Sequence, residues 1–461
     1  MANTVAERVS ILQASDFSAL SEPLQLQKVS VPKTILLPYQ AALLTANQTF
    51  FSLFQKCFPA FIAFVLSEYS FSYSFVTKAL AIGSLTTMIC IVITPHLLHF
   101  KSNTVQFLNC IICCVGTVVL WYFRYHQYVL FTIGIALVLN SYQLQWGAMN
   151  AMISSFVSKN DKAIAHQYLS AVSSGWTTAT FLFVGVGYIL KYETFWAYLE
   201  WMFLIFLILA FLNLLLLPKV SVNQYNVLHH SQYEMDKRIS MKQDLKVLFS
   251  IQEYRLILVI LSTGFFCWSW IYTSFGFWIQ RLYTLDQAEL GIAAALIEGV
   301  GNAIAILCIT YLAKTHDDDE TEEEDDDDES EQEQRPRNGY KMKLEVMMVY
   351  FAVMIFVSVL ALLLASYVEQ LTFLLQYKAF VYTCICAYYC GNEVVIVGAL
   401  ILNVTETPPK QQARSSAIVS IANSICMFIG QATVGIVYEI GSFPLETPFI
   451  LALSAVLIAS T

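Results

Sequence analysis

The sequence has little charge for its length of 461 residues. Charged side chains make up 13% of the chain and hydrophobic ones 57%, whereas soluble domains have about 25% charged and about 45–50% apolar residues. The sequence also lacks a nucleophile elbow, a phosphate-binding loop and a metal-ligand spacing of cysteine and histidine. We therefore expect a membrane protein that is neither an enzyme nor an ATP-driven pump, and that uses no cofactor, metal or nucleic acid.

Two further absences concern processing and redox chemistry. Residues 1–40 have no continuous apolar stretch of the kind that forms a signal peptide, so we expect the first spanning helix to direct insertion. The eleven cysteines are scattered, and the CxxC at 110–113 has no partner at a metal-site spacing. We interpret them as small apolar residues of membrane helices, without disulfides.

What the chain does have is long apolar segments, since a helix needs about 20 residues to cross a bilayer. Twelve segments qualify, although the last is short and leaves open whether the C-terminus is truncated. The sequence thus predicts an all-α polytopic membrane protein with twelve transmembrane helices in two six-helix halves. The predicted spans are 41–66, 75–98, 105–123, 128–151, 164–189, 194–217, 253–279, 289–313, 343–366, 373–402, 413–438 and 446–461.

The polar segments divide the chain and predict its orientation. A tail over 1–40 precedes the N-terminal half at 41–217, and a central loop over 218–252 precedes the C-terminal half at 253–461. With the N-terminus in the cytoplasm, nineteen Lys and Arg residues of the polar segments and span ends fall inside and three fall outside. This bias predicts that both termini are cytoplasmic, and it leaves the membrane of residence open.

The net charge of −9 comes from one loop. Residues 317–333, within the loop 314–342 between spans eight and nine, hold 14 of the 34 acidic residues. A charge block this dense is typical of a disordered, solvated segment. A weaker alternative is a binding site for a cytosolic partner.

Three ionisable residues fall near the middle of predicted spans: Lys56, Glu298 and Glu393. A central Lys or Asp costs about 2.5–3.5 kcal/mol, and such residues usually face the bundle interior or water. We expect an ion pair plus one carboxylate that exchanges a proton near neutral pH. Lys56 is the expected counter-charge of Glu393, with Glu298 less central. The alternative is a structural ion pair or a hydrogen bond to a neighbouring helix, without a part in transport.

Two segments carry distinctive local motifs. "GNEVVIVGALILNVTETPPKQQARSSAIVSIANSICMFIGQATVGIVYEIG", residues 391–441, is similar to the tenth and eleventh helices of small-molecule efflux permeases in the major facilitator superfamily. "YTLDQAELGIAAALIEGVGNA", residues 283–303, resembles the eighth helix of that branch. Two segments depart from the pattern. The loop at 93–103 lacks the usual Asp, and the fifth helix, at 173–190, lacks the proline of proton-driven antiporters.

The resemblance implies that helices one, four, seven and ten line a central cavity. The residues that it places there, together with the three charges, form the predicted site for a small solute. These residues are Lys56, Gln143, Trp146, Trp270, Asn392, Glu393 and Glu298.

The sequence therefore predicts a secondary active transporter that moves a small solute by alternating access between its halves. Proton coupling, the direction of transport and the charge of the solute stay open. The alternative is a transporter-like receptor or scaffold that no longer transports and uses its acidic loop.

Overall fold

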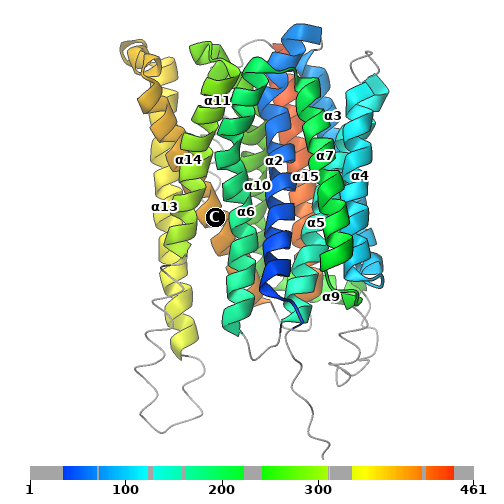
Figure 1. Ribbon diagram of the computed structural model, residues 1–461. Coiled ribbons are helices and arrows are strands. Elements are labelled where there is room, and N and C mark those ends of the chain that lie inside the picture. Colours follow the sequence, from blue (N-terminus) through cyan, green and yellow to red (C-terminus); the bar gives the residue numbers. More distant parts are fainter. Residues whose placement is uncertain are drawn as a thin grey trace, which may run out of the picture.

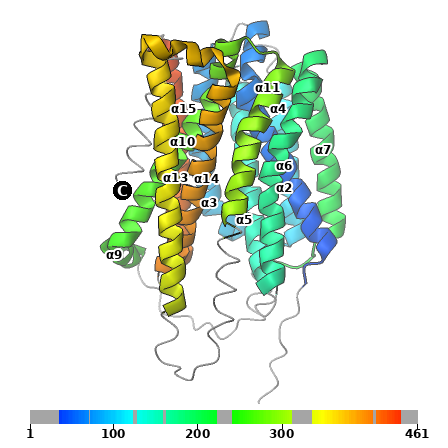
Figure 2. The same cartoon turned by 90° about the vertical axis from the view of Figure 1, so that its left-hand side faces the viewer.

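The computed structural model describes residues 35–69, 72–122, 128–157, 162–222, 241–309, 311, 335–407 and 412–440. Within these ranges the chain is a bundle of long helices that run roughly along one axis (Figures 1 and 2). The first six are α2 (Pro38–Tyr69), α3 (Tyr73–Leu97), α4 (Ser102–Tyr122), α5 (Tyr128–Phe156), α6 (Lys162–Tyr192) and α7 (Phe195–Leu216). They form the N-terminal half.

The remaining described helices belong to the C-terminal half, apart from a short one before it. They are α9 (Met241–Ser250), α10 (Gln252–Tyr283), α11 (Gln287–Ala294), η3 (Ala295–Gly299), α13 (Arg335–Tyr367), η4 (Glu369–Gln376), α14 (Lys378–Glu406) and α15 (Gln412–Ile440). The π-helical turn η3 continues α11, and the whole helix runs over Gln287–Ile309.

Length and apolar composition explain why these helices suit a membrane. In the described ranges, nine of them are long and apolar enough to span a bilayer, and α2 and α6 have 32 and 31 residues. Large apolar side chains point outward, as Leu215 on α7 and Val349 on α13 do. A soluble protein rarely exposes so much apolar surface, so the prediction of a polytopic all-α membrane protein is confirmed.

The predicted spans agree with the helices except near some ends. The tenth span, predicted from 373, begins at Lys378, because η4 and the extended residue Tyr377 precede it. Helix α13 begins at Arg335, inside the predicted loop 314–342, and α9 lies inside the predicted loop 218–252. Hydropathy marks the apolar core of a span but not the residue at which its helix starts. The acidic run 317–333 and the twelfth span, 446–461, lie outside the described residues.

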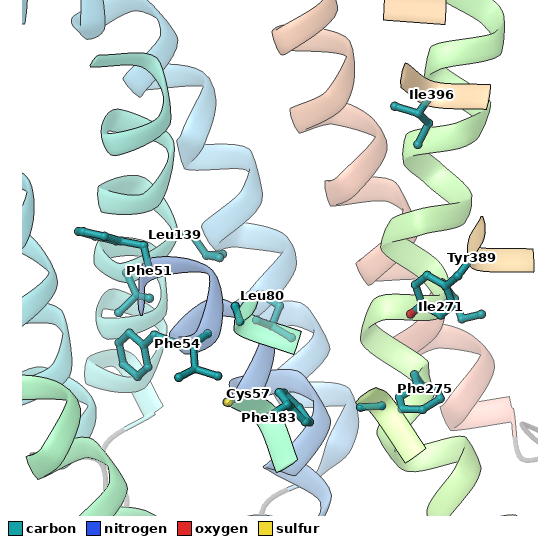
Figure 3. Packing of buried hydrophobic residues seen from close by; sticks show 14 of the residues in the cluster. Phe51, Phe54, Cys57, Leu80, Leu139, Phe183, Ile271, Phe275, Tyr389 and Ile396 are labelled. Carbon is teal, nitrogen blue, oxygen red and sulfur yellow. The ribbon is translucent and has the colours of Figure 1, made fainter. Parts of the chain in front are cut away.

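Apolar packing holds each half together on one face of its helices. In the N-terminal half, Phe51 and Phe54 of α2 pack against Phe206 of α7, with ring centroids 4.8 and 5.7 Å apart. In the C-terminal half, Ile271 of α10 and Tyr389 of α14 belong to the buried cluster (Figure 3). Helix α2 therefore buries Phe51 and Phe54 within its own half, while Lys56 reaches across to the other half.

The two halves meet along three sets of helices: α3 with α15, α6 with α11 and η3, and α2 with α10. We call the end of the bundle where α6 ends and α11 begins the Asp286 end, and the opposite end the Pro38 end. Gly187 of α6 lies against α11, where an added Cβ would be 2.5 Å from the carbonyl oxygen of Gln287. Lys191 and Asp286 form an ion pair there, at 2.8 Å. The halves are thus closely joined at the Asp286 end.

At the Pro38 end the described contacts include several that stay within one half. The backbone N–H of Ile35 donates to the carbonyl of Phe156 at 2.8 Å, and the hydroxyl of Ser415 donates to Asn403 at 2.7 Å. Helices α5 and α14 make no extensive contact with each other over their described residues. The described residues therefore join the halves more closely at the Asp286 end than at the Pro38 end.

Candidate functional site

The structure brings the three predicted charges to the middle of the bundle. Lys56 projects from α2, Glu298 from the turn η3 inside the helix Gln287–Ile309, and Glu393 from α14. Each lies many residues from either end of its long helix. Glu393 is near enough to interact electrostatically with both of the others. One charge comes from the N-terminal half and two from the C-terminal half, so the cluster lies between the halves.

Lys56 and Glu298 form a buried ion pair across the two halves. The Lys56 ammonium donates to the Glu298 carboxylate, and also to the hydroxyl of Thr180 on α6 at 2.5 Å. It lies 3.9 Å from the centroid of the Trp176 ring. Lys56 is 2% exposed and Glu298 is 9% exposed. A buried pair needs such extra contacts, because Coulomb attraction alone rarely offsets the loss of hydration.

The expected pairing of Lys56 with Glu393 was wrong, since Glu298 is the partner. The reason is local backbone geometry combined with helix packing. Glu298 lies in a π-helical turn, which inserts a residue and shifts the direction of side chains relative to a regular α-helix. The turn η3 also packs against α6, which carries Thr180 and Trp176. Glu298 is therefore central to the cluster, although its helix is not among the four that the resemblance placed around the cavity.

Glu393 has a different environment from Glu298. It is partly exposed, and no hydrogen bond or ion pair joins it to another described residue. Its neighbour Asn392 is 1% exposed. The Asn392 amide donates a long hydrogen bond of 3.4 Å to the carbonyl of Gly264, and its side-chain oxygen has no partner among the described residues. Glu393 thus keeps a carboxylate, next to an unpartnered acceptor, that is open to a further group.

A row of aromatic rings runs from one half to the other beside the ion pair. Tyr142 of α5 lies 6.1 Å from Trp176 of α6, measured between ring centroids, and Trp176 lies 5.6 Å from Trp268 of α10. Trp268 stacks on Tyr272 at 4.8 Å with an interplanar angle of 10°. The Tyr272 hydroxyl donates to the carbonyl of Gln55 on α2. We call Tyr142, Trp176, Trp268 and Tyr272 the aromatic row.

Sequence reasoning missed Trp176 as a site residue. Trp176 and Thr180 are four residues apart, so they share one face of α6 and reach the same ammonium. A signal was present, because the stretch SSGWTTAT at 173–180 places one large ring among small polar residues inside a span.

The other predicted residues take different positions. Trp270 is 0% exposed and packs against the ring of Phe266 at 6.3 Å, so Trp268 and not Trp270 belongs to the aromatic row. Gln143 and Trp146 are partly exposed on α5. No hydrogen bond or ring contact among the described residues joins either of them to the charged cluster. Asn392 lies beside Glu393.

The side chains of this cluster are suited to binding a solute and to exchanging a proton. In the described ranges, no group of three or more His, Cys, Asp or Glu side chains could hold a metal ion. What the cluster offers is one paired and one unpaired carboxylate, a paired ammonium and a row of aromatic faces.

Comparisons with known proteins agree with this architecture. The model of the family "Major Facilitator Superfamily" matches residues 144–431. The solved structure of a D-xylose–proton symporter is 12% identical, with a TM-score of 0.67 over 91% of this chain and 95% of the other. The nucleoside transporter NupG is 14% identical, with a TM-score of 0.62 over 91% and 97%.

A third similar structure is an inward-open conformation of the xylose transporter XylE from E. coli. It is 11% identical, with a TM-score of 0.60 over 91% of this chain and 94% of the other. No curated protein sequence matches the chain significantly. At these identities the structures support the fold, and none of them assigns a solute.

Proposed function

The chain belongs to the Major Facilitator Superfamily, and we propose that it is a secondary active transporter that moves a small solute by alternating access. Lys56, Glu298 and Glu393 are the charges through which solute, and a coupling proton, would act. The sequence resemblance to the efflux-permease branch stays a prediction and does not fix the direction of transport.

The observation that carries the proposal is the ion pair between Lys56 and Glu298. It joins α2 of one half to η3 of the other at the middle of the bundle. In alternating access the halves rock around a central site, so movement of one half against the other strains or breaks this pair. Breaking a buried pair leaves uncompensated charge at a cost of about 3–5 kcal/mol. Opening thus needs a compensating event.

Two events could compensate for the loss of the pair. A proton on Glu298 would remove the carboxylate charge, or Glu393 could replace Glu298 as the counter-charge of Lys56. Either event depends on whether Glu393 is free or occupied by a solute. A solute or a proton at Glu393 would therefore change the free energy of the rocking movement, which is the physical requirement for coupling.

The contacts between the halves support a particular state of this cycle. Close packing and the pair of Lys191 with Asp286 join the halves at the Asp286 end, and α5 and α14 make no extensive contact over their described residues. If both termini are cytoplasmic, as the basic residues predict, the Asp286 end faces outward. The conformation would then be closed to the outside and poised to open inward.

The test is solute uptake by the purified protein in proteoliposomes that contain a pH-sensitive dye. Gradients of nucleosides, sugars, short peptides and amines are applied in turn. We expect saturable uptake of at least one class with a pH change of the lumen, and loss of both in Glu393→Gln. The exposed Glu253, at the start of α10, provides the matched control Glu253→Gln, which should retain uptake.

Three other outcomes would change the proposal. Saturable uptake without a pH change would remove proton coupling and keep the transporter. Unchanged uptake in Glu393→Gln would remove Glu393 from the mechanism. A folded wild-type protein that takes up no solute of any class would overturn the proposed function.

A further inference from the structure

We propose that the transported solute is an organic cation, flat in part and bearing N–H donors, which binds at Glu393 beside the aromatic row. This inference rests on the proposed function and adds the chemical class of the solute. Charge, hydrogen-bonding capacity and ring surface at the site are three separate arguments for it.

The charge count at the cluster favours a cation. Lys56 supplies one positive charge, and Glu298 and Glu393 supply two carboxylates. The Lys56 ammonium is already enclosed by the Glu298 carboxylate, the Thr180 hydroxyl and the Trp176 ring. It has little capacity left for an anionic solute, which would also be repelled by Glu393. Of the two carboxylates in the cluster, that of Glu393 has no partner among the described residues. An ammonium group on the solute would supply its counter-charge.

On α2 and α14, the helices that carry Lys56 and Glu393, three amide oxygens are unpartnered among the described residues. The side-chain oxygens of Gln48 and Gln55 on α2, and of Asn392 on α14, are buried and have no partner among the described residues. The Gln48 amide donates to Ser52 at 3.2 Å and to Tyr142 at 3.4 Å, so its donor side is in use and its acceptor side is not. Buried polar atoms are usually paired. A solute with several N–H donors would satisfy them.

The aromatic row offers faces for a flat cation. Tyr142, Trp176 and Trp268 are each partly exposed, and their rings follow one another at 5.6–6.1 Å. The contact of Lys56 with the Trp176 ring shows that this row already accepts one cation. Aromatic faces attract cations through their quadrupole, and Trp is the strongest of the three aromatic residues in this respect.

The test uses three probes that share an indole ring and differ in the charge of the tail. Tryptamine is a cation with N–H donors at pH 7.5, tryptophol is neutral, and indole-3-propionate is an anion. Binding to the purified full chain in detergent is measured by calorimetry and by the shift in melting temperature. We expect tryptamine to bind at least tenfold more tightly than indole-3-propionate, with tryptophol between them.

Variants show whether the preference comes from Glu393. In Glu393→Gln we expect tryptamine to lose at least tenfold in affinity, while tryptophol changes less than threefold. Glu393→Asp keeps the charge on a shorter side chain, so it should retain part of the preference and provides a second variant should Glu393→Gln fold poorly. Glu253→Gln, the exposed control, should bind all three probes as the wild type does.

The result that overturns the inference is binding without preference for the cation. Three other results also overturn it. They are tighter binding of indole-3-propionate, no measurable binding of tryptamine at 10 mM, and equal losses of affinity for tryptamine and tryptophol in Glu393→Gln. The uptake assay separates this failure from that of the proposed function. Uptake of a neutral or anionic solute without tryptamine binding refutes the inference and supports the transporter. Tryptamine binding with no uptake of any solute refutes the proposed function and keeps only a cation-binding site at Glu393.

Discussion

The ion pair between Lys56 and Glu298 leads to a quantitative prediction about stability. Lys56→Met removes the ammonium and leaves a Glu298 carboxylate that is only 9% exposed. Breaking one side of a buried pair costs about 3–5 kcal/mol, whereas removing both charges is often nearly neutral. We therefore expect Lys56→Met to lower the free energy of unfolding by about 3–5 kcal/mol, and the double variant with Glu298→Gln to lie within about 1 kcal/mol of the wild type.

The single variant Glu298→Gln should cost less than Lys56→Met. In Glu298→Gln the Lys56 ammonium still has Glu393 nearby, and Glu393 can replace part of the lost interaction. In Lys56→Met no described cation remains near the two carboxylates. The order of the two single variants is thus set by the third charge of the cluster, and it tests the geometry of all three.

The measurement is reversible unfolding in mixed micelles, followed by tryptophan fluorescence, for the wild type, the two single variants and the double variant. The matched control is the exposed pair, in which Lys191→Met and Asp286→Asn should give a coupling of at most about 1 kcal/mol, because solvent screens it. If Lys56→Met is no less stable than the double variant, or if the exposed pair couples as strongly, the reasoning about the buried pair is refuted.

Three further predictions concern the contacts between the halves and the aromatic row. Gly187→Leu should lower the free energy of unfolding by about 1–3 kcal/mol, because the new side chain overpacks against a backbone carbonyl of α11. The control Gly185→Leu should not, because no atom lies within 4 Å of an added Cβ there. Equal effects of the two variants would contradict the close contact at Gly187. The Lys191 ammonium, with a backbone N–H at the start of α11, holds the pKa of Asp286 below its usual value. The stabilisation from Asp286 is therefore present above its unfolded-state pKa and is lost as pH falls through the lowered pKa. The difference in melting temperature between the wild type and Asp286→Asn should shrink below about pH 4, and a difference independent of pH would refute this. Trp176→Leu removes the cation–π contact and should cost about 1–2 kcal/mol in the same unfolding assay; no cost would show that the ring does not stabilise the ammonium.

The aromatic residues show why part of the site escaped prediction. Helix α10 contains both Trp268 and Trp270, and their order in the sequence does not say which one faces the other half. The structure buries Trp270 against Phe266 and leaves Trp268 in the aromatic row. Small polar residues mark Trp176 in the sequence, but which helices its ring would meet was open until α6 was packed against its neighbours. Which face of a helix is buried depends on the surrounding helices, and an apolar span has no polar face to indicate it.

The membrane fold, the approximate spans and the three charges inside them could be predicted from the sequence alone. These features are local, because a run of apolar residues and a charge within it have a cost in a bilayer whatever surrounds them. The pairing of Lys56 with Glu298 rather than Glu393, and the close contact of the halves at the Asp286 end, became evident from the packing of the helices. Those outcomes depend on a π-helical turn and on contacts between residues far apart in the chain, such as Gly187 against α11, which no local pattern in the sequence encodes.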